Sequence, residues 1–228
     1  MTRHALVFKQ AWSLARGRSG VRGCVLAAAG AMILTACGSL FAPAPAAPHF
    51  YTLDGPAATS VAPTAAPAST AGGLAPVMIV ALPRAAAGFD TDRIVYVSEA
   101  HRLQPYADNQ WIDTPAKMLE PLIAAALSRT GAFGAVLQAP GPVNGQWELR
   151  SDIVRLQHEV VASRFRFTLQ VTLIEKRTLT VAMAREFDAS EPIIGTGPAA
   201  AVSAANLVVA DVLHQMAAAC ASEVVRRR

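Results

Sequence analysis

Hydrophobic and polar residues alternate most regularly between Arg164 and Leu173, and this pattern predicts a β-strand with one covered and one solvent-exposed face. The apolar positions of this strand are Phe165, Phe167, Leu169, Val171 and Leu173. A second alternating segment begins at Trp147, but its phase slips at Ile153, which predicts a β-bulge near that residue. A turn at 175–178 and a return strand over 180–187 complete a predicted antiparallel meander.

Shorter segments predict the rest of a sheet. Residues 49–53 are aromatic and β-branched, as is typical of a short strand. Residues 77–82 form a continuous apolar run, which is typical of a central strand buried on both faces. Residues 93–97 and 134–138 predict two further strands. The polar segment from Tyr106 to Trp111 is predicted to be either a strand or a structured loop.

Two segments have the apolar spacing of helices. Thr114 and Pro115 favour a helix start, because threonine can cap a helix and proline is tolerated at the first helical position. Pro121 predicts a kink in this helix, and Gly131 favours a left-handed end. A longer helix is predicted over 199–224, and its apolar stripe consists of Val202, Ala205, Val209, Val212, Leu213, Met216, Cys220 and Val224.

Together these elements predict one α/β domain over residues 49–225, with a mixed β-sheet and two main helices packed on one face. Residues 55–76 contain almost only Ala, Pro, Ser, Thr and Gly, which indicates a low-complexity insert inside this domain. A domain boundary at the insert is disfavoured, because the five residues 49–53 before it cannot form a domain and must join the strands after it.

The N-terminal pattern is that of an export signal. Residues 1–36 contain five basic residues and no acidic one, and they end in an apolar stretch over 24–36, as in a secretory signal peptide. As a helix this stretch would measure about 20 Å, which is too short for a hydrocarbon core of about 30 Å.

The end of this stretch, Leu34-Thr35-Ala36-Cys37, resembles the bacterial lipobox. That resemblance implies cleavage between Ala36 and Cys37, and a diacylglycerol and an N-acyl chain on Cys37; the alternative is an ordinary signal peptide that contains a cysteine. Gly38 follows where an aspartate would indicate retention, so resemblance to bacterial sorting signals implies the outer membrane. Residues 37–48 then form a Pro/Ala tether.

The net charge changes sign when the predicted signal peptide is left out. The 228 residues carry 20 basic and 16 acidic side chains, a net charge of +4, but the chain without residues 1–36 keeps 15 basic against 16 acidic, a net charge of −1. This balance disfavours nucleic acid as a partner and attraction to anionic lipid as the anchor. Cys220 becomes the one cysteine left without lipid, so no internal disulfide is expected.

A search for chemistry yields no catalytic residue and no metal site. The histidines that follow the signal, His49, His101, His158 and His214, lack the spacing of metal ligands. Ser151 and His158 are a poor nucleophile pair, because odd and even positions face opposite sides of an unbulged strand.

Four residues are candidate partner contacts. Arg164 and Arg166 share the polar face of their strand and could meet an anionic partner or a lipid headgroup; the alternative is an ordinary solvated strand face. Tyr106 and Trp111 are the favoured contacts, because Tyr and Trp are enriched at interface hot spots. The alternative is that Trp111 fills the core beside the helix start.

The order of several short motifs resembles the ABC-type transport auxiliary lipoproteins (PqiC-like). The motifs are Tyr51-Thr52-Leu53, Leu82-Pro83, Asp92-Arg93-Ile94-Val95-Tyr96, Trp111 with Pro115, Met118 and Leu119, and Gly131 with Phe133 and Val136. Each motif is short, and their order and spacing over 37–224 carry the resemblance. The insert at 55–76 is longer than the family pattern, and Gln110 stands where the family often has a basic residue.

The resemblance implies a non-catalytic lipoprotein without a cofactor, anchored in the outer membrane and facing the periplasm. Its implied partner is the MCE-domain protein of a system with an ABC ATPase and a permease, which moves lipids or other hydrophobic molecules across the Gram-negative envelope. Phospholipid and a second copy of the chain are further candidate partners. Two other function classes stay open: an assembly partner or chaperone of an outer-membrane β-barrel, and a periplasmic hydrolase.

Overall fold

A computed structural model describes residues 47–54, 75–141 and 143–227, all within the unit Ala47–Arg228. The predicted signal peptide, the lipobox with Cys37, most of the tether and residues 55–74 of the insert lie outside the described residues. In chain order the elements are β1 (His49–Tyr51), β2 (Val77–Val80), β3 (Arg84–Ala85), β4 (Arg93–Glu99), β5 (Arg102–Trp111), α2 (Pro115–Arg129), β6 (Ala135–Gln138), β7 (Trp147–Glu159), β8 (Arg164–Glu175), β9 (Thr180–Pro192) and α3 (Gly197–Arg226).

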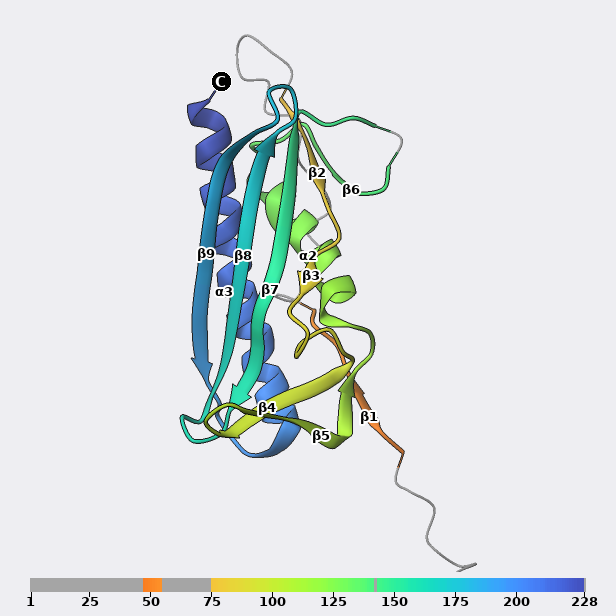
Figure 1. Cartoon of the computed structure of the whole chain (residues 1–228), viewed down its shortest axis with the longest axis vertical. Helices are drawn as coiled ribbons and strands as arrows, with labels where there is room; N and C mark the ends of the chain where they lie inside the picture. Colours follow the sequence, from red (N-terminus) through yellow and green to blue (C-terminus); the bar gives the residue numbers. More distant parts are fainter. Residues whose placement is uncertain (1–46, 55–74, 142, 228) are drawn as a thin grey trace, which may run out of the picture. The chain divides into compact units, whose positions relative to one another are not determined.

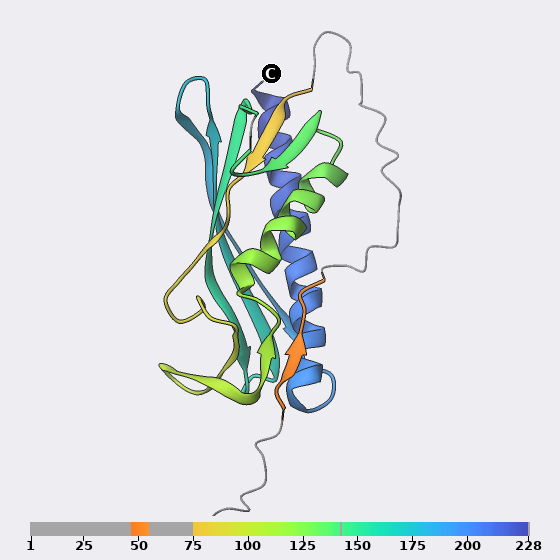
Figure 2. The same cartoon turned by 90° about the vertical axis from the view of Figure 1, so that its right-hand side faces the viewer.

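The nine strands of the described residues form one mixed sheet (Figure 1). β8 pairs antiparallel with both β7 and β9, whereas β2, β3 and β4 lie one after another along the other edge of β7 and run parallel to it. β6 adds to β2, and β5 and β1 add to β4. Figure 2 shows α2 and α3 on the same face of this sheet, as the sequence predicts.

The predicted bulge in β7 is confirmed. The pairing of β7 with β8 shifts between Ile153 and Arg155, so that Ile153 lies opposite Leu169 and Leu156 lies opposite Phe167. Ile153 and Leu156 are both buried. The extra residue therefore keeps apolar side chains on the covered face along the whole of a strand whose sequence pattern changes phase.

The segment with the most regular alternation of apolar and polar residues forms β8, and its predicted apolar face is fully buried. Phe165, Phe167 and Leu169 are each 0% exposed. The prediction of a wet opposite face is wrong at Thr168, which is also 0% exposed. Its hydroxyl donates a hydrogen bond of 2.5 Å to Asp188 on β9, so the flanking strand covers it.

The segment 106–111, predicted as a strand or a loop, belongs to strand β5. The run that begins at Val77 forms β2 between β6 and β7. Met78 and Val80 are 0% exposed, but Val77 and Ile79 are only half-buried. β2 is therefore fully covered on one face alone, because both helices pack on the same side of the sheet.

α2 begins at Pro115 as predicted, but the hydroxyl of Thr114 makes no capping hydrogen bond. Gly131 follows the helix with a φ of +67°, the left-handed conformation that glycine tolerates best. α2 continues through Pro121, and the kink expected there stays a prediction.

α3 extends beyond the predicted helix at both ends, and the whole of the predicted apolar stripe, including Cys220, is buried. It packs on β8, β9 and α2. By length and composition, α3 is the one helix among the described residues that could cross a membrane, with half of its most apolar window buried inside the fold. This packing identifies α3 as the core helix of the sheet.

Candidate functional site

The described residues contain no group of three or more His, Cys, Asp or Glu side chains that could hold a metal ion. Ser151 is 3% exposed and its Oγ has no hydrogen-bond partner in the structure, whereas His158 is bonded to Tyr106. The seven residue steps from Ser151 to His158 along β7 correspond to roughly 20 Å. Ser151 and His158 are therefore not brought together.

Tyr106 connects two strands of the sheet through a polar contact. Its hydroxyl oxygen lies 2.6 Å from Nδ1 of His158, and its ring centroid lies 4.8 Å from that of Tyr96. Burial, together with the nearby Tyr96, raises the pKa of Tyr106, and burial lowers the pKa of His158. Neutral pH therefore favours the uncharged forms of both groups. Because Tyr106 is half-buried, only part of its side chain is accessible to a partner.

Trp111, the other aromatic candidate, lies in the core. It is the last residue of β5 and is 2% exposed. Its backbone N–H donates to the carbonyl of Asp92 at 2.7 Å, which fixes the strand end just before α2. The alternative interpretation, that Trp111 fills the core beside the helix start, fits this burial, and the side chain is not accessible to a partner in this fold.

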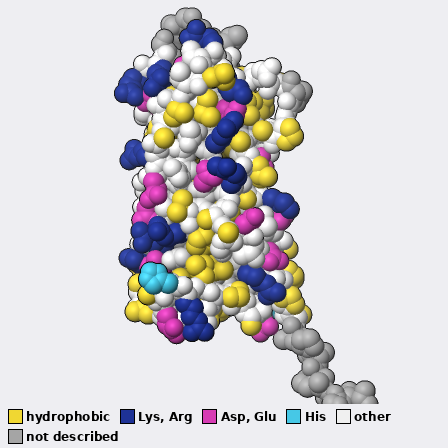
Figure 3. Space-filling view, viewed as in Figure 1, with side chains coloured by type: hydrophobic (Ala, Val, Ile, Leu, Met, Phe, Trp, Pro, Cys, Tyr) yellow, Lys and Arg dark blue, Asp and Glu magenta, His cyan; other side chains and the backbone are white. Residues whose placement is uncertain are grey.

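Arg164 and Arg166 alternate along β8 with the buried Phe165 and Phe167, so they lie on the sheet face opposite the helices. The view in Figure 3 shows basic and acidic side chains intermixed on the surface. Arg164 Nε donates to Glu159 at 2.6 Å. Arg166 makes a two-pronged contact with Asp188, with Nε to Oδ1 at 2.9 Å and Nη2 to Oδ2 at 2.8 Å. The Arg166 hydrogen bond, more than the one from Thr168, holds the pKa of Asp188 below its usual range.

On this face both arginines are therefore paired with acidic side chains, in place of the free cations that the sequence indicated. A bidentate pair holds the guanidinium plane in one orientation, so the surface is pre-organised for a partner that matches its alternating charges. The sequence missed the acidic halves of the pairs, because Glu159 and Asp188 come next to the arginines only through strand pairing.

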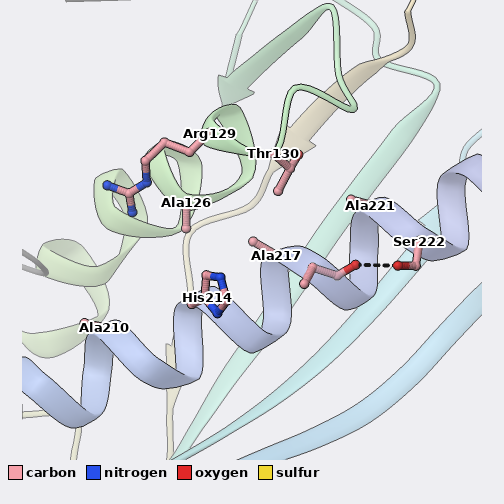
Figure 4. Close-up of a pocket in the computed structure, with 9 residues that line it drawn as sticks. Ala126, Arg129, Thr130, Ala210, His214, Ala217, Ala221 and Ser222 are labelled. Atoms are coloured by element: carbon pink, nitrogen blue, oxygen red, sulfur yellow. Dashed lines mark hydrogen bonds between the residues drawn. The ribbon is translucent and has the colours of Figure 1, made fainter. Parts of the chain in front are cut away.

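A groove of about 630 Å³ opens between α2 and α3 (Figure 4). Five alanines line it together with Arg129 and Thr130 of the α2 end, and His214 and Ser222 of α3. Ser222 donates its hydroxyl to the carbonyl of Ala218, so this hydroxyl is already satisfied within α3. Arg129 and His214 lie on different helices beside the groove, and both are exposed.

Sequence reasoning did not find this groove. Its floor exists because alanines, which are too short to fill the space, meet where two helices approach each other. The alanines of α3 that line the groove are at positions 210, 217, 218 and 221. This spacing of small residues along the helix is the sequence feature that could have indicated the groove. The groove has the apolar lining and few polar groups typical of a small-ligand site, but the structure identifies no occupant.

Comparison with protein families gives one match. The model of a family described as "ABC-type transport auxiliary lipoprotein component" matches residues 51–217. The match begins at the last residue of β1 and ends inside α3, so it spans β2 to β9, the whole of α2 and the first part of α3. No curated protein matches the chain.

Two solved structures share the fold. Protein XCC0632 from Xanthomonas campestris superimposes with a TM-score of 0.63 at 21% identity, covering 68% of this chain and 88% of its own. A second structure, of an uncharacterized protein, has a TM-score of 0.58 at 14% identity and covers 78% of this chain and 99% of its own. At these identities the similarity establishes the fold alone.

Proposed function

Because the chain belongs to the family of ABC-type transport auxiliary lipoprotein components, we propose that it is an outer-membrane-anchored periplasmic lipoprotein that docks an MCE-type lipid transport system. Its family is one of transport auxiliary lipoproteins and not an enzyme family. In the proposed role it performs no catalysis, and it helps to move lipids or other hydrophobic molecules across the Gram-negative envelope.

The observation that carries the proposal is the position of the family match relative to Cys37. The match begins at Tyr51, and the lipobox-like sequence ends at Cys37, which leaves a short Pro/Ala tether between them. Three acyl chains on Cys37 would hold the protein firmly, since one chain gives only marginal binding and two or more give stable anchoring. The net charge of −1 after the signal supports lipid, and not charge, as the anchor.

The sheet face supports a docking role. It presents the Arg164–Glu159 and Arg166–Asp188 pairs on a surface that neither helix covers. Interfaces of transient complexes are about as polar as the rest of a protein surface, so a paired and rigid polar face is a suitable docking surface. We infer that this face meets the MCE-domain partner. Tyr106 contacts His158, which lies opposite the buried Phe165, so it belongs to the helix-covered side of the sheet and not to this face.

Affinity capture of the full lipoprotein from envelope membranes tests the proposal. An MCE-domain protein is expected in the captured fraction, and it should disappear when Arg164 and Arg166 are both replaced by Met. Replacing Arg177, which lies in the β8–β9 turn and pairs with Glu175, is the matched control and should leave capture unchanged. Recovery of an outer-membrane β-barrel in place of an MCE protein would instead favour the assembly-partner function.

A further inference from the structure

The two most exposed large hydrophobic side chains of the described residues lie at one end of the sheet. Ile194 is 91% exposed, in the loop between β9 and α3, and Val161 is 86% exposed, in the turn between β7 and β8. The two loops are joined, because the Ile193 N–H donates to the carbonyl of Ser163 at 2.8 Å. Val160, 39% exposed, extends the same turn. We call Val160, Val161 and Ile194 the apolar tip.

The described chain begins near this end. His49 of β1 pairs with Asn109 of β5, and the neighbouring Gln110 pairs with Arg93 of β4. β4 then leads to Val97, which pairs with Glu159 directly before the tip. The four steps from 93 to 97 span only about 13 Å. Figure 1 and Figure 2 both show the start of β1 at the end of the sheet where the β7–β8 turn and the β9–α3 loop lie.

The length of chain between Cys37 and the domain determines which end of the sheet can lie at the membrane. Ala47 lies ten residue steps after Cys37, and a chain of that length reaches at most about 36 Å. The opposite end of the sheet lies one β8 length beyond the tip, and the 12 residues of β8 span roughly 40 Å. Of the two ends of the long sheet, lipid on Cys37 therefore holds the end with the apolar tip closer to the membrane, and the exposed Phe50 and Ile112 beside the start of β1 lie on the same tethered side.

We propose that the apolar tip inserts into the interface of the phospholipid bilayer in which Cys37 is anchored. This inference rests on the lipid attachment that the proposed function assigns to Cys37. Branched aliphatic side chains on a convex tip suit a bilayer interface, where they leave water without the shape match that a protein partner requires. The orientation would direct the long β7–β8–β9 sheet away from the membrane and leave its polar face free for a partner.

The charges beside the tip fit this assignment. Arg164 is paired with Glu159 at 2.6 Å, and Arg102 is paired with Glu99 at 3.1 Å. Neither pair leaves a net charge that would oppose or drive contact with lipid headgroups. Glu191, three residues before Ile194, has no ion pair among the described residues, so adhesion would depend on apolar burial and not on attraction to anionic headgroups.

The opposite end of the sheet supplies a matched comparison. Leu179, 76% exposed, lies in the β8–β9 turn, and Val181 and Val225 are 57% and 58% exposed nearby. Arg177 lies in the same turn as Leu179, with 84% of its side chain exposed. If exposed apolar side chains and basic charge alone determined the membrane contact, the end with Leu179 and Arg177 would contact the membrane. The two hypotheses therefore predict contact at opposite ends of the sheet, and one experiment distinguishes them.

Depth-dependent fluorescence quenching tests the proposal with the full acylated protein. Val161→Cys, Ile194→Cys and Leu179→Cys are each labelled with an environment-sensitive fluorophore, since Cys220 is buried. The protein is reconstituted in vesicles of phosphatidylethanolamine and phosphatidylglycerol that contain a lipid spin-labelled on its acyl chain. Labels at 161 and 194 should be quenched several-fold more strongly than the label at 179, and their emission should shift to the blue.

The outcomes separate this inference from the proposed function. An acylated protein whose labels at 161 and 194 are quenched no more than the label at 179 overturns the tip contact and leaves the docking role intact. An intact mass without acyl chains overturns the anchor itself. Shielding of the tip labels by a captured MCE-domain protein, without vesicles, would assign the tip to a protein contact and also overturn the proposal.

Discussion

The hydroxyl oxygen of Tyr106 lies 2.6 Å from Nδ1 of His158, a contact between β5 and β7 across 52 residues of sequence. β5 is not a direct partner of β7 in the sheet, since β4 lies between them. The contact therefore ties β5 to β7 across β4, at the end of the sheet where β4 pairs with β7. Its strength depends on His158 staying neutral, because a protonated ring has no acceptor nitrogen and Tyr106 would have to accept its hydrogen bond.

We expect this histidine to make the fold less stable in mild acid. Burial holds the pKa of folded His158 below the ordinary value of 6.5, so the unfolded chain takes up the proton first as the pH falls. The contribution of His158 to the free energy of unfolding is complete above pH 6.5 and is lost as the pH falls through 6.5 toward the lower folded pKa. Denaturant unfolding at several pH values would measure this slope.

His158→Gln should flatten that slope, and His214→Gln is the matched control. His214 is exposed on α3, whereas His158 is half-buried on β7. An unchanged pH dependence in His158→Gln would contradict the assignment.

Arg166 should matter more for partner capture than for stability. Arg166→Met removes both contacts with Asp188, but the pair is partly exposed on the sheet surface and such pairs contribute less than about 1 kcal/mol. The midpoint of thermal unfolding should therefore change little, while capture of the MCE-domain partner falls. A large loss of stability would show that the pair is structural, and that the docking role of this face needs another residue.

Much of this fold is local enough to be predicted from sequence. The alternation in β8, the phase slip at Ile153 and the apolar stripe of α3 are each read from side chains within one element, and the structure confirms all three. The two-residue strand β3 could not be predicted, because it exists only through its pairing with β7.

The candidate site was harder to predict, because it too depends on how elements distant in sequence pack together. Tyr106 and Trp111 are similar in sequence terms, yet one keeps an exposed part and the other is 2% exposed, since burial depends on how β5 approaches the start of α2. The partner of Arg166, Asp188, lies on β9, and its identity required the register of the hairpin. Predicting the groove would have required the distance between α2 and α3, which the sequence alone does not give.

Cys37→Ser should release the protein from the membrane. The serine hydroxyl is not a substrate for thiol-directed lipid attachment, so neither acyl chains nor cleavage at Ala36 is expected. Intact mass and membrane fractionation would measure both effects. Cys24→Ser, within the same apolar stretch, is the control and should be processed normally; a Cys37→Ser chain that stays membrane-bound through residues 24–36 would disprove the lipobox.

Cys220 should be almost unreactive in the folded protein. Burial raises the pKa of its thiol from 9.0 to about 12, so the thiolate that reacts with alkylating reagents is about a thousandfold scarcer than for a free thiol. Iodoacetamide at mildly alkaline pH should leave Cys220 unmodified, and the same treatment in denaturant should modify it fully. Rapid modification of the folded protein would show that the packing of α3 on the sheet opens readily.

Asn206 on α3 should hold the first strand in place. Its side-chain Oδ1 accepts from the Asp54 N–H at 2.7 Å, and its Nδ2 donates to the carbonyl of Thr52 at 3.2 Å. Asn206→Ala removes both bonds to the residues just after β1, a three-residue strand whose only partner among the described strands is β5. We therefore expect a loss of about 1–2 kcal/mol in unfolding free energy. Amide hydrogen exchange should accelerate at Asp54 and in β1 while β8 stays protected. Ser203→Ala, one turn earlier and bonded only within α3, is the control; equal effects of the two substitutions would mean that Asn206 acts on the helix and not on the strand.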